Sequence, residues 1–464
     1  MAESDVCWLG IADLVTAYRA RRLSPVEVTR TFLDRIERLD GALHSFLTVT
    51  DELALSQAAA AERCYAAGGP TPPLLGVPVS IKDAFHVEGV VTTLGSVVHR
   101  DHVAKNDSGV VRRLRAAGAV FTGKTNTAEF GQSATTDNLL GPDTANPWDP
   151  ARTPGGSSGG AAASVAAGLS TVAVGSDGGG SIRIPAAFTG LYGLKPSPGV
   201  CPDEKGFRAM TDFTSPGPLA ARVADARVLF SVLAGSTHPR RPVSAPLRIR
   251  YCPNPEGRPV EAEVAAAVEH AVTTLAELGH DVVEGDLPVE GWNDVFGPLV
   301  LDDEHRERGH LLGHAAQHLT RYERSSLRAA EALDPAVVRR AHELLPIYRR
   351  RIDALFADHD VLVTPTTAVA AFPLRERPTS VGGVPVDTLW GAFPFAVPFN
   401  VAGVAAASLP CGLVDGLPVG VQLVTRAGAE QLLLDVSEDL EEALAFDRAP
   451  VKARWTLDHA GSAG

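Results

Sequence analysis

Two segments rich in glycine and serine constrain the fold of this chain more than any other feature. The first, residues 154–160, reads PGGSSGG and precedes a run of small residues that predicts a helix over 161–167. The second, residues 176–183, reads SDGGGSIR and follows an apolar run that predicts a strand over 170–175. Glycine lets backbone N–H groups converge, because no Cβ blocks close approach. Such a turn can hold a phosphate or a developing oxyanion.

The rest of the chain alternates short apolar runs with helical patterns, which favours an α/β fold. We expect strands at residues 77–81, 119–122 and 361–365, and helices at 25–41, 51–67 and 335–356. The predicted fold is α/β, with a mixed central β-sheet covered by α-helices on both faces. We expect a single domain over 1–464, with a core at about 70–235 and a variable substrate or lid region at about 290–400.

Composition excludes several classes of partner. The formal net charge is −13, so nucleic-acid binding lacks its main driving force. The longest apolar runs, 159–175 and 391–410, consist of small residues or are broken by prolines, and neither predicts a membrane span. The five cysteines are scattered and show no metal-ligand spacing, and residues 1–5 show no leader pattern. We therefore expect a cytoplasmic protein without a disulfide framework or a structural zinc site.

A serine at the end of a glycine turn suggests a nucleophile beside its own oxyanion hole. No lysine stands where a phosphate-binding P-loop requires one, and the G-x-S-x-G pattern is not met at Ser181. None of the 14 histidines lies in the two segments, so lysine is the alternative base. Lys82 ends an apolar strand, where burial would lower its pKa. A plain glycine-serine linker is the competing interpretation.

Several blocks in order resemble the amidase signature family. They are GVPVSIKD at 76–83, TPGGSSGG at 153–160, residues 176–185, GKTN at 123–126, NPWD at 146–149, GLKP at 193–196, GPLA at 217–220, SLPCG at 408–412 and GLPVGVQ at 416–422. The spacings also agree, with 75 residues from Lys82 to Ser157 and 24 from Ser157 to Ser181. The resemblance covers most of the chain.

This resemblance implies a serine amide hydrolase that works on a small-molecule amide and needs no metal or organic cofactor. It implies that Lys82 is the base, Ser157 (after a cis peptide bond) relays the proton, and Ser181 attacks the carbonyl. The implied oxyanion donors are the backbone amides of Gly178, Gly179, Gly180 and Ser181, and the implied supporting residues are Ser158, Asp177 and Arg183. Homodimers are common among similar proteins, so we expect one here.

Two departures from the family pattern bear on function. Ile184 replaces a polar residue found in some members, which suggests a less polar wall. The SLDQ segment typical of the ammonia-producing chain of glutamyl-tRNA amidotransferase is absent, and residues 212–217 read DFTSPG instead. We therefore favour a free-standing hydrolase. The alternatives are an amidotransferase A-type chain that supplies ammonia to a partner, and a non-catalytic scaffold.

Other charged residues have simpler interpretations. Lys124 follows a strand and suits a structural role. His310, His314 and His318 recur at helical spacing and could share one face, but no matching metal-ligand set accompanies them. A polar lining of the substrate entrance or a solvated face is expected there. The charged run at 302–308 is expected to be solvated, and to belong to a lid.

Overall fold

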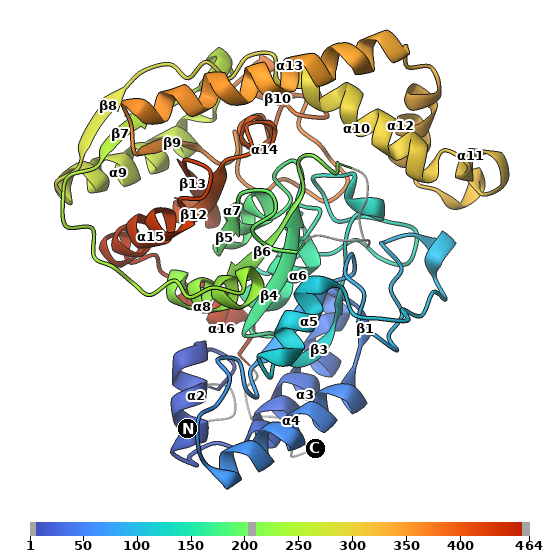
Figure 1. The fold of residues 1–464 in the computed structure, drawn as a ribbon, viewed down its shortest axis with the longest axis vertical. Helices are drawn as coiled ribbons and strands as arrows, with labels where there is room; N and C mark the ends of the chain where they lie inside the picture. Colours follow the sequence, from blue (N-terminus) through green and yellow to red (C-terminus); the bar gives the residue numbers. More distant parts are fainter. Residues whose placement is uncertain (1–5, 203–209, 457–464) are drawn as a thin grey trace.

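The computed structural model describes residues 6–202 and 210–456 (Figure 1). Residues 1–5, on which the expectation about a leader rests, lie outside this part of the chain. Within it, eleven strands form one sheet in the order β1-β3-β2-β4-β6-β5-β12-β13-β9-β7-β8, and β10 and β11 form a hairpin. The strands are β1 (Phe46–Val49), β2 (Pro78–Lys82), β3 (Val120–Thr125), β4 (Val172–Asp177), β5 (Tyr192–Lys195), β6 (Ser215–Ala220), β7 (Arg248–Tyr251), β8 (Asp281–Glu284), β9 (Val361–Pro365), β10 (Ser380–Val381), β11 (Val384–Pro385), β12 (Ala405–Val414) and β13 (Leu417–Thr425).

The sheet is mixed, as predicted. β2 runs parallel to both β3 and β4, and β7 runs parallel to β8 and β9, whereas the other pairs are antiparallel. The α-helices are α2 (Ile11–Arg19), α3 (Pro25–Leu43), α4 (Asp51–Ala67), α5 (Gly109–Ala116), α6 (Gly159–Ala166), α7 (Arg183–Thr189), α8 (Val223–Ala234), α9 (Ala262–Glu277), α10 (Trp292–Arg308), α11 (Leu311–His314), α12 (Arg321–Glu331), α13 (Pro335–Asp353), α14 (Val397–Val401), α15 (Glu430–Leu444) and α16 (Ala449–Arg454).

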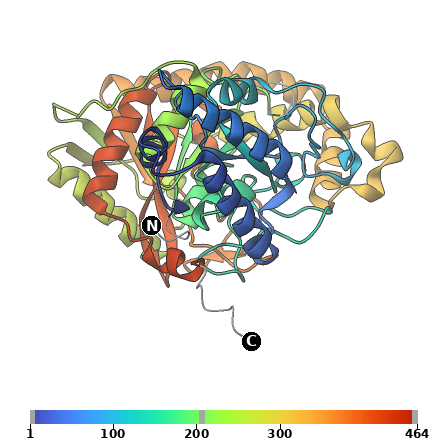
Figure 2. The same cartoon turned by 90° about the horizontal axis from the view of Figure 1, so that it is seen from below.

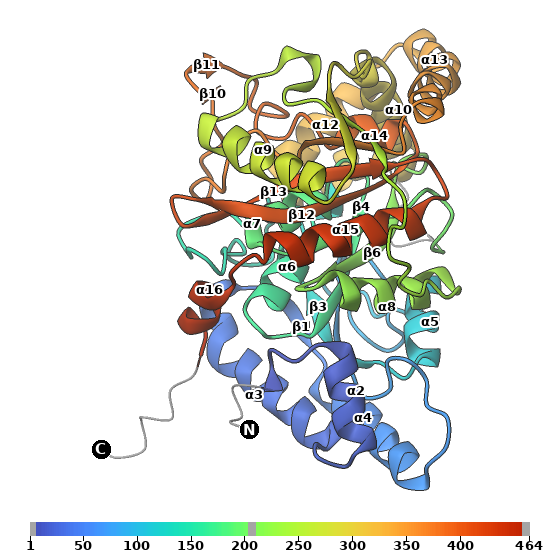
Figure 3. The ribbon, with the colours of Figure 1, turned by 90° about the vertical axis from the view of Figure 1, so that its left-hand side faces the viewer.

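Two groups of helices cover the sheet. α15 packs on both α8 and α9, and these helices cover β6 and β12, whereas α6 and α7 pack together against β4, β12 and β13 (Figure 3). The N-terminal helices α3 and α4 lie at one end of the molecule, in front of the view in Figure 2. Helices α10 to α13 extend from the opposite end in Figure 1. The largest apolar core is built around this sheet.

Local signals explain most of the element boundaries. α3 begins after Ser24, whose side chain accepts hydrogen bonds from the amides of Val26 and Glu27. We expected Gly41 to end this helix, but it continues to Leu43 and ends at His44, which adopts a left-handed conformation. Tertiary packing buries Leu43 fully, which accounts for the two additional residues of the helix.

The expectation that His310, His314 and His318 share one helical face is wrong. α11 ends at His314, Ala315 leaves helical geometry, and His318 lies in a separate short 3₁₀ turn. The rings of His310 and His314 stack with centroids 5.7 Å apart, and all three side chains are exposed. Among the described residues, no group of histidine, cysteine or acidic side chains is arranged to hold a metal ion.

Candidate active site

The predicted base lies where the sheet topology brings strand ends together. Lys82 is the last residue of β2, and β4, which runs parallel to β2, ends beside it at Ser176 and Asp177. The Lys82 side chain is fully buried. Its Nζ lies 2.7 Å from Oγ of Ser157 and 2.9 Å from Oγ of Ser176. The parallel pairing of β2 and β4 thus brings Lys82 into contact with both glycine-serine segments.

Burial sets the charge state of Lys82. Removal of the ammonium from water lowers the pKa of Lys82 to about 7, although the nearby Asp177 carboxylate opposes this change. A large fraction of the amine is therefore neutral near pH 7. Neutral lysine is able to accept a proton from a hydroxyl at 2.7 Å.

Ser157 follows a cis peptide bond at Gly156–Ser157, as the resemblance implies. Its loop is held by Thr136, whose Oγ1 donates to the carbonyl of Gly155 at 2.8 Å and accepts from the amide of Gly159 at 3.0 Å. Thr136 was not predicted, because it lies outside the glycine-serine motif and reaches the loop through the fold. Ser157 itself is buried, with its hydroxyl on Lys82.

Ser181 lies in the turn between β4 and α7. Ser181 and Gly179 are half-buried, whereas Gly178, Gly180 and Ile182 are buried. The carbonyl of Ser181 accepts from the amide of Ser158 at 3.2 Å, so the two segments are hydrogen-bonded to each other. The predicted nucleophile is thus partly accessible, in a turn whose other residues are buried apart from Gly179.

Ser158 connects the two segments through the backbone. Its Oγ donates to the carbonyl of Ser176 at 3.2 Å and accepts from the amide of Ser176 at 3.3 Å. These bonds fit the expected supporting role, since the Ser158 hydroxyl is occupied by backbone groups.

Asp177 and Arg183 form a fully buried ion pair that shapes the turn, with 2.9 Å between Nε and Oδ2. Burial alone would raise the pKa of Asp177, but the charge and hydrogen bonds of Arg183 outweigh it and hold that pKa well below its usual range. Asp177 also accepts hydrogen bonds from the amides of Gly180 at 2.7 Å and Ile182 at 3.3 Å. The ionised carboxylate therefore fixes the backbone on both sides of Ser181.

The hydrogen bond from Gly180 bears on the oxyanion prediction. Its amide points at Asp177 and not at a substrate, which leaves Gly178, Gly179 and Ser181 as candidate donors. Gly180 has a φ of +113°, and a Cβ there would lie 2.7 Å from Cβ of Ala396. Both the backbone conformation and this close approach therefore require glycine.

Two further polar residues complete the support for the turn, and sequence reasoning missed their roles. Asn400 donates to Oδ1 of Asp177 at 2.8 Å and accepts from Arg183 at 2.5 Å. Gln422 accepts from Arg183 at 2.6 Å. Both are fully buried and lie more than 200 positions from their partners, so the local sequence carries no signal of the contact. Gln422 belongs to the GLPVGVQ block, which indicated the family of the chain but not the role of this residue.

Among the residues that the structure describes, the other two buried lysines, Lys124 and Lys195, contact no serine in this way. Lys124 forms a buried ion pair with Asp83 at 2.7 Å and donates to Thr92 at 2.8 Å, in agreement with a structural role. Burial also lowers the pKa of Lys195 to about 7, but its Nζ donates to the backbone carbonyls of Pro196 and Val404. Contact with Ser157 therefore distinguishes Lys82, since a lowered pKa alone does not.

An aromatic cluster forms one wall beside the turn. A Cβ at Gly179 would lie 3.3 Å from Phe296 and 3.6 Å from Trp390. The ring centroids of Phe296 and Trp390 are 5.8 Å apart. The ring of Trp292 lies 5.6 Å from that of Trp390, and the ring of Phe213 lies 5.2 Å from that of Phe296. The wall is apolar, so it can exclude water from the carbonyl under attack.

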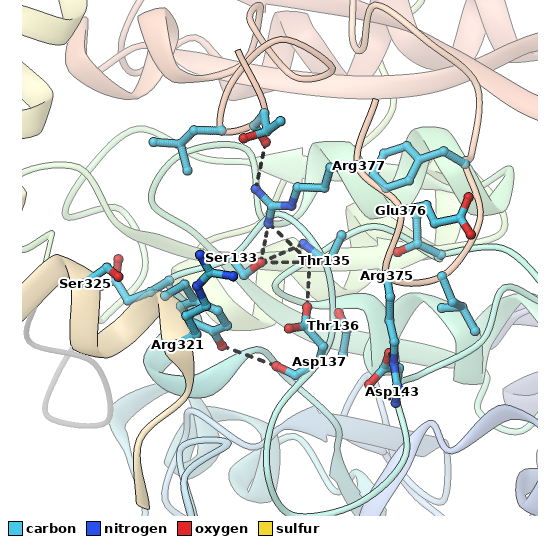
Figure 4. Close-up of a pocket in the computed structure, with 17 residues that line it drawn as sticks. Ser133, Thr135, Thr136, Asp137, Asp143, Arg321, Ser325, Arg375, Glu376 and Arg377 are labelled. Atoms are coloured by element: carbon cyan, nitrogen blue, oxygen red, sulfur yellow. Dashed lines mark hydrogen bonds and ion pairs between the residues drawn. The ribbon is translucent and has the colours of Figure 1, made fainter. Parts of the chain in front are cut away.

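A cavity of about 650 Å³ adjoins the loop of Ser157 (Figure 4). Thr135, Thr136 and Thr153 line it from the side of the glycine-serine segments. Arg321 and Tyr322 line it from α12, and residues 374–377 and 388–389 line it from the variable region. Its volume lies within the range typical of small-molecule sites.

The comparisons with known proteins agree with one another. The family model described as Amidase matches residues 27–434. The chain is 36% identical to the putative amidase AmiA2 of Mycobacterium tuberculosis, over 96% of this chain and 95% of that protein. It is 34% identical to the A chain of the glutamyl-tRNA(Gln) amidotransferase of Moorella thermoacetica, over 96% of this chain and 98% of that protein.

A solved structure shares the fold along almost the whole chain. It is the crystal structure of a bacterial aryl acylamidase of the amidase signature family, with 27% identity, a TM-score of 0.87 and coverage of 97% of this chain and 98% of that one. The family and the fold are therefore supported by independent comparisons of sequence and of structure.

No helix in the described part of the chain is both long enough and apolar enough to cross a bilayer.

Proposed function

The chain belongs to the amidase signature family and is an amide hydrolase, and from this premise we propose that it cleaves a carboxylic acid amide through an acyl-enzyme on Ser181. The observation that carries the proposal is the contact of a buried lysine of lowered pKa with Ser157, 2.7 Å away. The half-buried Ser181 lies in the adjoining turn.

In the proposed mechanism, neutral Lys82 takes a proton from Ser157 as Ser157 takes the proton of Ser181. The Ser181 oxygen then bonds to the amide carbon, and the amides of Gly178, Gly179 and Ser181 stabilise the negative charge on the carbonyl oxygen. Ser157 protonates the leaving nitrogen, the C–N bond breaks, and ammonia or an amine departs. Water attacks the ester through the same relay, which releases the carboxylic acid and restores Ser181.

Product release from a panel of amides tests this proposal. We expect the parent to release ammonia or an amine from at least one member of the panel, and Ser181→Ala and Lys82→Ala to lower that rate by at least about 10³-fold. Two exposed residues provide matched controls, Ser236→Ala and Lys105→Ala, which should retain the parent rate. Retention of activity in Ser181→Ala would contradict the assignment of the nucleophile.

A second candidate function follows from the likeness to the A chain of an amidotransferase, over 98% of that protein's length. Residues 212–217 lack the family segment typical of such chains and speak against it. The two functions differ in one measurable respect. A free-standing hydrolase turns over amides alone, whereas an ammonia-supplying chain shows glutaminase activity that depends on a second protein.

Three further properties belong to the proposal. We place the substrate-facing region at about 290–400, because Phe296 and Trp390 adjoin Gly179 and residues 374–377 line the cavity. The scattered cysteines, four of them buried, support a cytoplasmic setting. The resemblance to the family supports a homodimer, which light scattering coupled to size-exclusion chromatography would test.

A further inference from the structure

The cavity of Figure 4 adjoins the loop of Ser157, because Thr136 lines the cavity and is hydrogen-bonded to Gly155 and Gly159. Thr135 lines it, and the Thr135 carbonyl leaves no room for a Cβ at Gly156, the residue before Ser157. Leu389 lines the cavity on another side and precedes Trp390, which packs at Gly179. Thr135, which lines the cavity, thus packs on the loop of Ser157, and the residue after Leu389 packs on the turn of Ser181.

The most buried cation of this cavity is held by neutral groups. Arg377 donates to the Oγ of Ser133 at 2.6 Å, the Oγ1 of Thr135 at 3.2 Å and the carbonyl of Thr388 at 3.2 Å. Figure 4 shows its guanidinium group directed at Ser133 and Thr135. Within residues 6–202 and 210–456, Arg377 forms no ion pair with a carboxylate. The positive charge thus lies in a cavity without a directly bound counter-ion.

The acidic residues of the cavity are engaged elsewhere. Asp143 pairs with Arg375 at 2.7 Å, on the outer side of the same loop. Asp137 accepts from the Oγ1 of Thr135 at 2.6 Å, and its charge acts on Arg377 without a direct ion pair between the two side chains. Burial raises the pKa of Asp137, which favours its neutral form. Glu376 is exposed.

We propose that Arg377, with the hydroxyls of Ser133 and Thr135, binds a carboxylate group of the substrate, so that the enzyme prefers amides that carry an acidic group. A guanidinium group donates two parallel hydrogen bonds to a carboxylate, and hydroxyls released from Arg377 can donate as well. Arg321, which also lines the cavity, adds positive charge to it. The subsite rests on the proposed function, because the cavity serves Ser181 only if Ser181 is the nucleophile.

Matched pairs of anilides test the subsite. Glutaryl 4-nitroanilide and pentanoyl 4-nitroanilide differ by a carboxylate on the acyl side, and 4-acetamidobenzoate and acetanilide differ by one on the amine side. We expect kcat/KM for the acidic member to exceed that for the neutral member by about 10- to 100-fold in at least one pair, mainly through KM. Arg377→Leu should reduce this ratio at least about 10-fold, and Arg377→Lys should restore part of it.

Arg426→Leu is the matched control, because Arg426 is an exposed arginine paired with an aspartate, Asp353, and neither residue lines the cavity. It should keep the parent ratio. Equal hydrolysis of acidic and neutral members in both pairs by the parent would overturn the subsite, as would an equal loss on both members in Arg377→Leu.

Competition with a fluorophosphonate probe separates this failure from failure of the proposed function. Acidic anilides should slow labelling of the parent at lower concentration than neutral ones. Labelling without any such difference would overturn the subsite alone. No labelling of the parent would overturn the nucleophile assignment and the subsite with it.

Discussion

Lys82, the proposed base, can accept a proton only in its neutral form, so the pH dependence of the reaction should report its environment. Burial lowers its pKa to about 7, and the neutral fraction therefore rises as pH increases through that value. We predict that kcat/KM rises about tenfold per pH unit below pH 7 and levels off above it. A pH-rate profile checks this. A rise in kcat/KM centred near pH 10, the ordinary range of the lysine pKa, would contradict the burial argument.

Arg183 neutralises a carboxylate that has no contact with water. Removal of the guanidinium group in Arg183→Leu leaves Asp177 charged in a buried site, so we predict a loss of about 3–5 kcal/mol in the free energy of unfolding. Urea titration of parent and variant measures it. The exposed pair Arg340–Glu343 provides the control, and Arg340→Leu should change stability by less than about 1 kcal/mol. Similar losses in both variants would contradict the proposed role.

Residues that act within a contiguous motif could be predicted from the sequence, whereas those recruited by the fold could not. The resemblance to the amidase signature family implied that Lys82 and Ser157 act together, and the structure contains the contact between them. Asn400 and Gln422 join Arg183 from more than 200 positions away, and only the sheet order brings them together. The amide of Gly180 was expected to face the substrate, but it donates its hydrogen bond to the carboxylate of Asp177 instead.

At the scale of elements, the charged run 302–308 differs from expectation. Arg306 pairs with Asp302 and is exposed, as predicted for a solvated run. Glu304 and Arg308 are instead buried between α10 and α12, where Arg308 pairs with Glu323 at 2.9 Å. The expectation treated the whole run as exposed. Glu304 and Arg308 are four positions apart, so they lie on one face of the helix, and packing covers that face.

This buried cluster predicts a pH-dependent stability. Burial raises the pKa of Glu304, so the folded state holds a proton that the unfolded state releases. The resulting stability is present at pH below the ordinary glutamate pKa and is lost as pH rises through the raised value. The free energy of unfolding of Glu304→Gln, relative to that of the parent, should therefore rise by about 1–3 kcal/mol from pH 5 to pH 8.

Urea unfolding at the two pH values measures this gain. The exposed Glu343→Gln is the control and should show no such change. A difference between Glu304→Gln and parent that is the same at pH 5 and pH 8 would contradict a proton held by Glu304.

At the scale of the whole molecule, one sheet joins the N-terminal region to the variable region. β1 and β8 form its two edges, and the hairpin of β12 and β13 connects β5 to β9 across its middle. We therefore predict one cooperative unfolding transition for 1–464. Far-ultraviolet circular dichroism and tryptophan fluorescence should give coincident curves, since Trp8 and Trp148 probe a different core from Trp292 and Trp390. Two separated transitions would indicate separate domains.

The general fold class was predictable because the blocks that define it are local. Alternating strands and helices indicated a mixed α/β sheet, and β9 has the predicted bounds. The order of strands was not predictable, because pairs such as β5 with β12 join segments about 200 residues apart. The cavity at Arg377 has the same origin, since α12 and the loops at 132–137 and 374–377 form it together.

Intact mass after incubation with a fluorophosphonate probe tests the central claim most directly, with Ser181→Ala and Lys82→Ala run beside the parent. We predict one adduct on the parent, none on Ser181→Ala, and strongly slowed labelling of Lys82→Ala. An adduct that persists in Ser181→Ala would contradict the assignment of Ser181 as the nucleophile.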